Sequence, residues 1–141
     1  MLGGVTEKNT AVGTVNAEAH RDSIDPQTDA MVGDWLTLPD VAERFGVQVT
    51  RVRQLLRDNQ LIAVRRGENN ALHVPAGFIV GDHTVKGLTG TLTLLKDAKF
   101  TDEEALRWLF TPDDSLPGTP VEALRENRGT EVKRRAQAMA F

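Results

Sequence analysis

Residues 38–57, LPDVAERFGVQVTRVRQLLR, carry the steric pattern of two helices joined by a tight turn. Ala42 is small at the position where the first helix must press closely against the second. Gly46 follows four residues later, where the chain must adopt a left-handed conformation that costs glycine little. Val52 and Leu55 then fall where the second helix packs back into a core, and the other apolar residues of the motif are Val41, Phe45 and Val47. This spacing predicts a helix-turn-helix.

The second helix of this motif has a polar and cationic outer face. Its outward residues are Gln48, Thr50, Arg51, Arg53, Gln54 and Arg57. Arginine, glutamine and threonine are side chains that bind phosphates and read base edges. Residues 48–66 hold five arginines and one aspartate, a net charge of +4, in a chain whose net charge is −3. We therefore expect a recognition helix for double-stranded DNA, with Arg51 on a phosphate and the other outward residues facing the bases.

A short β-hairpin is expected directly after the second helix. Residues 61–66 (LIAVRR) form a β-prone run, residues 67–70 (GENN) have the composition of a turn, and residues 71–74 (ALHV) form a second run. The two asparagines of the turn tolerate the positive φ that a tight hairpin loop requires. A hairpin at this place is a wing, and the residues expected to contact phosphates or enter a minor groove are Arg65 and Arg66.

The composition limits the class of protein. With 141 residues, the chain is long enough for one compact domain or for a small domain with appendages. It has no cysteine, which excludes disulfides and thiolate chemistry and is typical of a reducing compartment. No run of about 18 apolar residues is present, and the N-terminus lacks the pattern of a secretory signal. We therefore expect a cytoplasmic protein with no membrane insertion.

The residue pattern gives little support to catalysis or metal binding. The three histidines are scattered, without acidic partners at metal-ligand spacing: His20, His73 and His83. Glu103 and Glu104 are adjacent, so they point in different directions on a helix. The glycines at residues 87 and 90 lack the lysine and the strand context of a phosphate-binding loop. We expect a protein that is not an enzyme and that uses no cofactor and no metal.

The sequence divides into a disordered N-terminal tail (1–33), a winged helix-turn-helix (34–80) and a C-terminal helical extension packed on it (81–141). The tail is rich in small and polar residues and has no sustained helix or strand period. Residues 1–36 carry a net charge of −4, so much of the acidity lies outside the basic motif. The hydroxyls of the tail that could accept a phosphate are Thr6, Thr10, Thr14 and Ser23. The expected fold class is mainly α with a small β-hairpin wing.

Helix signals dominate the C-terminal extension. Its first helix is indicated by a one-sided apolar stripe formed by Leu88, Leu92 and Leu95. Residues 101–104 (TDEE) and 119–122 (TPVE) are capping boxes, and each should open a helix. Gly129 should break the chain before a last helix.

The last helix and the residues before it carry a second cluster of positive charge. Residues 125–135 have five basic and two acidic side chains, a net charge of +3. The basic residues are Arg125, Arg128, Lys133, Arg134 and Arg135. This cluster either extends a DNA footprint or forms the solvated side of a terminal helix, where the helix dipole favours cations. The sequence leaves both interpretations open.

Two resemblances follow from these motifs. Leu38 to Val74 resembles the winged helix-turn-helix of the MerR and excisionase type, in which LxxVAxxxGV precedes a helix, a strand and a wing. Leu38 to Phe141 resembles a family of small DNA-binding proteins of mycobacteria and corynebacteria, through the blocks VAERFGV, LIAVRR, RWLFTPDDSL, PVEAL and RRAQAMAF. This resemblance implies a winged-helix DNA-binding fold with extra C-terminal helices. It also implies regulation by a membrane-anchored Ser/Thr protein kinase that acts on the N-terminal tail.

A different class of function stays open beside the role of a transcriptional regulator or nucleoid-associated factor. Residues 108–124, WLFTPDDSLPGTPVEAL, are similar to the C-terminal half of antitoxins whose helices grip a toxin. In that alternative, the helix-turn-helix is a scaffold and the C-terminal helices bind a protein partner. No heptad repeat or other dimer element is evident in the sequence, so a monomer and a dimer are equally compatible with it.

Overall fold

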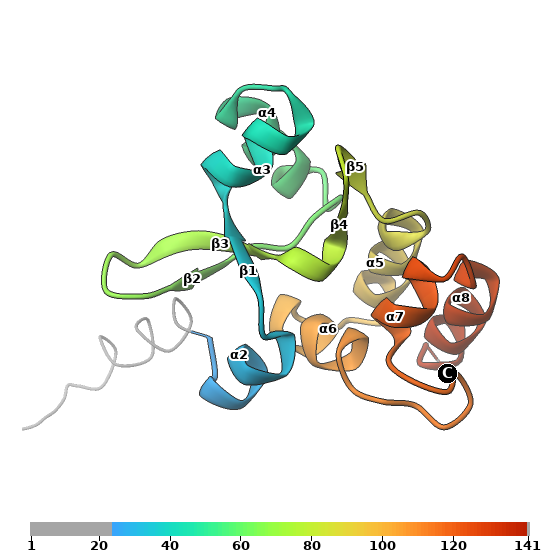
Figure 1. Ribbon diagram of the computed structural model, residues 1–141. Coiled ribbons are helices and arrows are strands. Elements are labelled where there is room, and N and C mark those ends of the chain that lie inside the picture. Colours follow the sequence, from blue (N-terminus) through green and yellow to red (C-terminus); the bar gives the residue numbers. More distant parts are fainter. Residues whose placement is uncertain (1–23, 141) are drawn as a thin grey trace, which may run out of the picture.

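The computed structural model describes residues 24–140 and shows seven α-helices and five strands in that range (Figure 1). The helices are α2 (Pro26–Val32), α3 (Leu38–Phe45), α4 (Val49–Arg57), α5 (Leu88–Asp97), α6 (Asp102–Leu109), α7 (Pro120–Arg125) and α8 (Gly129–Ala138). The strands are β1 (Trp35–Thr37), β2 (Val64–Arg66), β3 (Ala71–Pro75), β4 (Ile79–Val80) and β5 (His83–Thr84), and a short 3-10 helix, η1, is Ala76–Phe78. The expected class, mainly helical with a small β wing, is confirmed.

The helix-turn-helix consists of α3 and α4, as the sequence predicts. Thr37 and Asp40 form a capping box at the start of α3, with N–H to side-chain oxygen distances of 3.1 and 3.2 Å. Gly46 ends α3 in the left-handed conformation at φ +66°. The residues expected in the core are buried: Val41, Ala42, Val52 and Leu55. Val47, also apolar, lies in the turn between the two helices and is 38% exposed.

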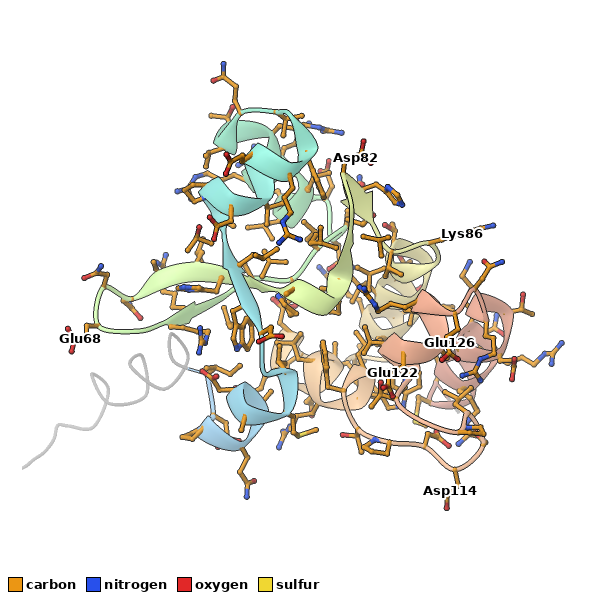
Figure 2. All side chains as sticks on the ribbon, viewed as in Figure 1. Glu68, Asp82, Lys86, Asp114, Glu122 and Glu126 are labelled. Atoms are coloured by element: carbon orange, nitrogen blue, oxygen red, sulfur yellow. The ribbon has the colours of Figure 1, made fainter. Side chains whose placement is uncertain are left out.

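An antiparallel sheet in the order β1-β3-β2 lies beside the helix-turn-helix (Figure 1). β2 and β3 form the predicted wing, and Gly67 and Asn70 in the turn between them both have positive φ. The label of Glu68 in Figure 2 marks the tip of this wing. The sequence does not predict β1, because three residues are too few to show an alternating pattern. β1 pairs with β3 alone, which leaves β2 as the opposite edge strand.

Residues 26–32 are helical, so the prediction that the disordered tail extends to residue 33 is wrong at this end. Asp25 caps α2, because its carboxylate accepts a hydrogen bond from Thr28 N–H over 3.2 Å, and Pro26 occupies the first turn. α2 lies across the sheet from α3 and α4 and contacts α6 (Figure 1). The predicted phosphate acceptors lie outside the described residues: Thr6, Thr10, Thr14 and Ser23.

The C-terminal helices pack beside the sheet, away from the wing tip (Figure 1). The leucine stripe of α5 is buried, as expected, at Leu88, Leu92 and Leu95. Both predicted capping boxes are present, Thr101 with Glu104 at α6 and Thr119 with Glu122 at α7. A break before the last helix is present, but it lies at Asn127, which has positive φ, and not at Gly129 as expected, because Gly129 is the first residue of α8.

One hydrophobic core joins the helix-turn-helix to the C-terminal helices. Phe78 of η1 is fully buried, and its ring centroid lies 5.8 Å from that of Phe110, which follows α6. Arg125 of α7 donates from Nη1 to the carbonyls of Gly77 and Ile79, each over 3.1 Å. The boundary expected after residue 80 falls inside the β4–β5 hairpin. The two parts are therefore linked by shared core residues as well as by the chain.

Candidate nucleic-acid interface

The outer face of α4 is polar and exposed. The six residues that the sequence assigns to this face are all exposed: Gln48, Thr50, Arg51, Arg53, Gln54 and Arg57. Val52 and Leu55 point to the core on the opposite side. The separation of polar and apolar residues that the sequence predicts for this helix is therefore present.

The periodicity of the helix places these side chains on different sides of α4, because successive residues are rotated by about 100°. Thr50, Gln54 and Arg57 project away from the buried Val52, whereas Arg51 and Arg53 lie on the two flanks of the helix. Arg51 Nη1 donates to Gln54 Oε1 over 3.2 Å. This hydrogen bond orients the Gln54 amide in the middle of the outer face.

A groove of about 270 Å³ lies between α4 and the wing. Arg53 lines it from α4 and Arg65 lines it from β2, so each element contributes one arginine to the same groove. The described lining contains no carboxylate; its other members are Thr37, Leu38, Pro39, Val49, Ala71 and Leu72. Arg65 Nη1 also donates to the carbonyl of Asn70 over 3.0 Å, which holds its side chain along the hairpin. The groove thus has an arginine on the side of the helix and another on the side of the wing.

Arg65 and Arg66 point to opposite faces of the sheet, because side chains alternate along a strand. Arg65 pairs in register with Leu72, and both line the groove beside α4. Arg66 faces the other side, where α2 lies. The two arginines that the sequence treats as equivalent therefore occupy different environments.

Arg66 forms a cluster with Asp29 of α2 and Trp35 of β1, here called the α2–wing cluster. Its Nε and a terminal nitrogen donate to the two oxygens of Asp29 over 2.7 and 2.9 Å. The guanidinium carbon lies 4.8 Å from the centroid of the Trp35 ring, and the indole N–H donates to Asp29 over 3.2 Å. The hydrogen bond from Arg66 lowers the pKa of Asp29 below its usual value, against the opposing effect of burial. Arg66, expected to contact phosphate, is thus already paired with a carboxylate.

The other flank of α4 faces the β4–β5 hairpin, whose tip is marked by Asp82 in Figure 2. Arg51 lines a second open groove there together with Asp82 and His83. His83 Nδ1 lies 3.0 Å from an Asp82 oxygen, and this hydrogen bond lowers the pKa of Asp82. Because a carboxylate lines this groove, it is less favourable to a phosphate than the groove beside the wing.

Most of the second basic cluster is engaged in contacts within the protein. Arg125 binds the carbonyls of Gly77 and Ile79, Arg128 binds Glu126 and the carbonyl of Leu116, and Arg135 Nε lies 3.5 Å from Asp113. Lys133 and Arg134 are exposed. The Lys133 side chain lies over Gly90 of α5, where an added Cβ would be 2.9 Å from Lys133 Cε. Gly90, which weakens the helix pattern of the sequence, thus makes room for α8.

No helix between residues 24 and 140 is long and apolar enough to cross a membrane. Among these residues, no three His, Asp or Glu side chains are placed to hold a metal ion.

Sequence reasoning missed Asp29 and Trp35 as partners of the wing. Asp25 followed by Pro26 is the same combination of cap and proline that predicts the helices beginning near residues 38 and 120. That local signal could have revealed α2. Its contact with Arg66 joins residues 37 positions apart, and no local pattern encodes it.

Comparisons with known proteins agree with this architecture. A family model described as "DNA-binding protein Rv2175c, wHTH domain" matches residues 23–79, and one described as "Rv2175c C-terminal domain of unknown function" matches residues 85–140. The chain is 44% identical over 117 residues to the DNA-binding protein Rv2175c of Mycobacterium tuberculosis, covering 74% of this chain and 79% of that protein. The NMR structure of Rv2175c matches with a TM-score of 0.71 and 41% identity, covering 85% of this chain and 86% of that one. The chain therefore belongs to the Rv2175c family of winged helix-turn-helix DNA-binding proteins.

Proposed function

We propose that this protein binds double-stranded DNA, with α4 in the major groove and the wing against the backbone, in a regulatory rather than a catalytic role. The observation that carries the proposal is the pair formed by Arg53 and Arg65, which line one groove beside the exposed polar face of α4. Guanidinium groups bind phosphates through charge-assisted hydrogen bonds. A phosphate between helix and wing would fix the register of α4 on the duplex.

The orientation of α4 supports a division of labour among its side chains. Thr50, Gln54 and Arg57 project furthest from the core and are proposed to reach base edges. Gln48, at the N-terminal end of the helix, is placed as the base-reading residues of recognition helices commonly are. Arg53 lies on the flank beside the wing, so we assign it to phosphate rather than to a base. Arg51 is assigned to phosphate and to the orientation of Gln54.

The test is fluorescence anisotropy on a duplex of about 25 base pairs across a salt series. The two phosphates assigned above, one bound by Arg51 and one shared by Arg53 and Arg65, predict a log–log salt slope of about −1.8, at about −0.9 each. The double variant Arg53→Ala/Arg65→Ala should weaken binding and flatten the slope by about 0.9, the value for the one phosphate that the two arginines share. Gln54→Ala should leave the slope unchanged and cost about 1–3 kcal/mol on a preferred site alone.

The matched control is Arg134→Ala, which removes one exposed arginine from α8. Its salt slope should equal that of the wild type. A slope that flattens for Arg134→Ala but not for the double variant would contradict the proposed surface. It would favour a footprint on the C-terminal cluster instead. No binding by the wild type at low salt would refute DNA binding itself.

We further propose that phosphorylation of the tail by a Ser/Thr protein kinase weakens DNA binding. The support is the family resemblance of the sequence and the repulsion between added phosphate charge and DNA. Replacement of Thr6, Thr10 and Thr14 by glutamate should lower DNA affinity, whereas replacement by glutamine should not. Equal affinities of the two triple variants would contradict this part of the proposal.

The protein-interaction alternative has less support on the described surface. Large apolar side chains that are exposed there are few and come from different elements: Met31, Val47 and Met139. The apolar residues of the antitoxin-like stretch are largely buried, including Leu109, Leu116, Val121 and Leu124. A partner that grips these helices would have to bind their polar sides.

A further inference from the structure

The α2–wing cluster brings together three residues from three elements. Asp29 comes from α2, Trp35 from β1 and Arg66 from the edge strand β2. Both members of the ion pair keep 27% of their side-chain surface exposed, so the pair lies between core and solvent. Neither of the two uses assigned to this region, the groove beside α4 and the hydrophobic core, requires a carboxylate at residue 29.

We propose that Asp29 is a positioning residue for DNA binding, which holds the wing so that Arg65 meets the same phosphate as Arg53. This inference rests on the proposed DNA-binding function. Asp29 itself does not contact DNA. It acts through Arg66, whose backbone is directly continuous with that of Arg65 in β2.

The geometry of the cluster fixes Arg66 in several directions at once. The two-point contact with Asp29 sets the plane of the guanidinium group. The Trp35 ring lies 4.8 Å from its centre and restricts movement along the perpendicular direction. The indole N–H binds the same carboxylate over 3.2 Å, so Asp29 is itself held in place.

The wing needs such an anchor because its backbone pairing is limited. β2 has three residues and lies at the edge of the sheet, where β3 is its partner. β1 pairs with β3 at residues 73–75, so nearer the tip the wing consists of β2 and β3 alone, and a two-stranded ribbon is marginally stable in water. Arg66 is the last residue of β2 before the turn at residues 67–70, so a contact there holds the wing near its tip.

Because Asp29 is negatively charged, the direction in which DNA affinity changes on its removal tests this proposal. A carboxylate near DNA repels phosphates, so its removal should strengthen binding if net charge alone mattered. Removal of a positioning carboxylate should weaken binding instead, because the wing and Arg65 lose their fixed place. The two effects have opposite directions, which makes the sign of the change informative.

The experiment compares Asp29→Asn with Asp34→Asn in the anisotropy assay. Both variants remove one negative charge from the same part of the chain, and Asp34 is exposed and makes no ion pair with any described residue. We expect Asp29→Asn to weaken DNA binding about five- to tenfold, as for the loss of roughly one charged hydrogen bond. Asp34→Asn should bind as tightly as the wild type or more tightly.

A second variant separates position from charge at Arg66. Arg66→Lys keeps the positive charge but cannot make the two-point contact with Asp29. It should weaken binding to a similar extent as Asp29→Asn, with the salt slope reduced by less than about 0.9, the value for one phosphate contact. Asp29→Glu, which retains the carboxylate, should recover part of the lost affinity. In NMR spectra, the Trp35 indole N–H and the amide of Arg65 should shift in Asp29→Asn and not in Asp34→Asn.

The outcomes are distinguishable. Asp29→Asn that binds DNA as well as Asp34→Asn would overturn the positioning role and leave the proposed function intact. Failure of the wild type and of Asp34→Asn to bind would overturn the proposed function, and this inference with it. If Asp29→Asn did not fold, a normal affinity of folded Arg66→Lys would still overturn the role.

Discussion

The buried ring of Phe78 should couple the stability of the winged helix-turn-helix to that of the C-terminal helices. Phe78 is fully buried in η1 and packs against Phe110 with ring centroids 5.8 Å apart. The substitution Phe78→Leu removes about three carbon atoms, which at about 0.8 kcal/mol each gives about 2.4 kcal/mol. Loss of the aromatic pair adds about 0.5–1.5 kcal/mol. We expect the free energy of unfolding to fall by about 3–4 kcal/mol.

The two tryptophans of the chain allow each part to be observed separately. Trp35 lies in β1 of the sheet, and Trp108 lies in α6 and packs against the core. Urea unfolding is followed by fluorescence in Trp108→Phe, which leaves Trp35, and in Trp35→Phe, which leaves Trp108. Each single-tryptophan protein is compared with its own Phe78→Leu derivative.

If both parts unfold together, Phe78→Leu lowers the urea midpoint by about the same amount in both backgrounds. With a slope of about 2 kcal/mol per molar urea, the expected shift is about 1.5–2 M. Coincident transitions are the signature of one cooperative unit. A midpoint that shifts for Trp35 but stays unchanged for Trp108 would show that the two parts are not coupled, because the C-terminal helices would then be stable without the junction.

Three further predictions concern stability. Because the pKa of Asp29 is lowered in the folded protein, the ionised carboxylate stabilises the fold above the unfolded pKa of about 3.9, and this stabilisation is lost as pH falls through the folded value. In urea titrations, the stability difference between the wild type and Asp29→Asn should therefore be constant near pH 7 and shrink below about pH 4. A difference that grows in acid would contradict this. Thr119→Ala removes the cap of α7 and should lower the free energy of unfolding by about 1 kcal/mol in thermal unfolding. Thr93→Ala, at an exposed position inside α5, should lower it by less. Equal losses of stability would argue against a stabilising role of the capping box. Gly46→Ala should lower the free energy of unfolding in urea by about 1–2 kcal/mol through backbone strain alone, because no atom lies within 4 Å of the added Cβ. Gly46→Asn should lower it by less, because asparagine tolerates the left-handed conformation better than alanine does. The reverse order would point to a steric cause.

Local patterns of residues were enough to predict the features that depend on neighbours a few positions away. Gly46 ends a helix because its left-handed conformation is local, and the caps at Thr101 and Thr119 bond to residues three positions on. The polar face of α4 follows from helical periodicity, so the exposed residues of the recognition helix were predictable. Turn composition likewise predicted the wing.

The difference between the two neighbouring arginines of the wing depends on contacts between distant parts of the chain. Arg65 lines the groove beside Arg53, whereas Arg66 is bound by Asp29, and this depends on strand register and on where α2 packs. The sequence likewise could not show that Arg125 bonds to the carbonyls of Gly77 and Ile79, which lie far from it along the chain. Charge is visible in a sequence, but its availability to a ligand depends on partners that only the folded chain brings within hydrogen-bonding distance.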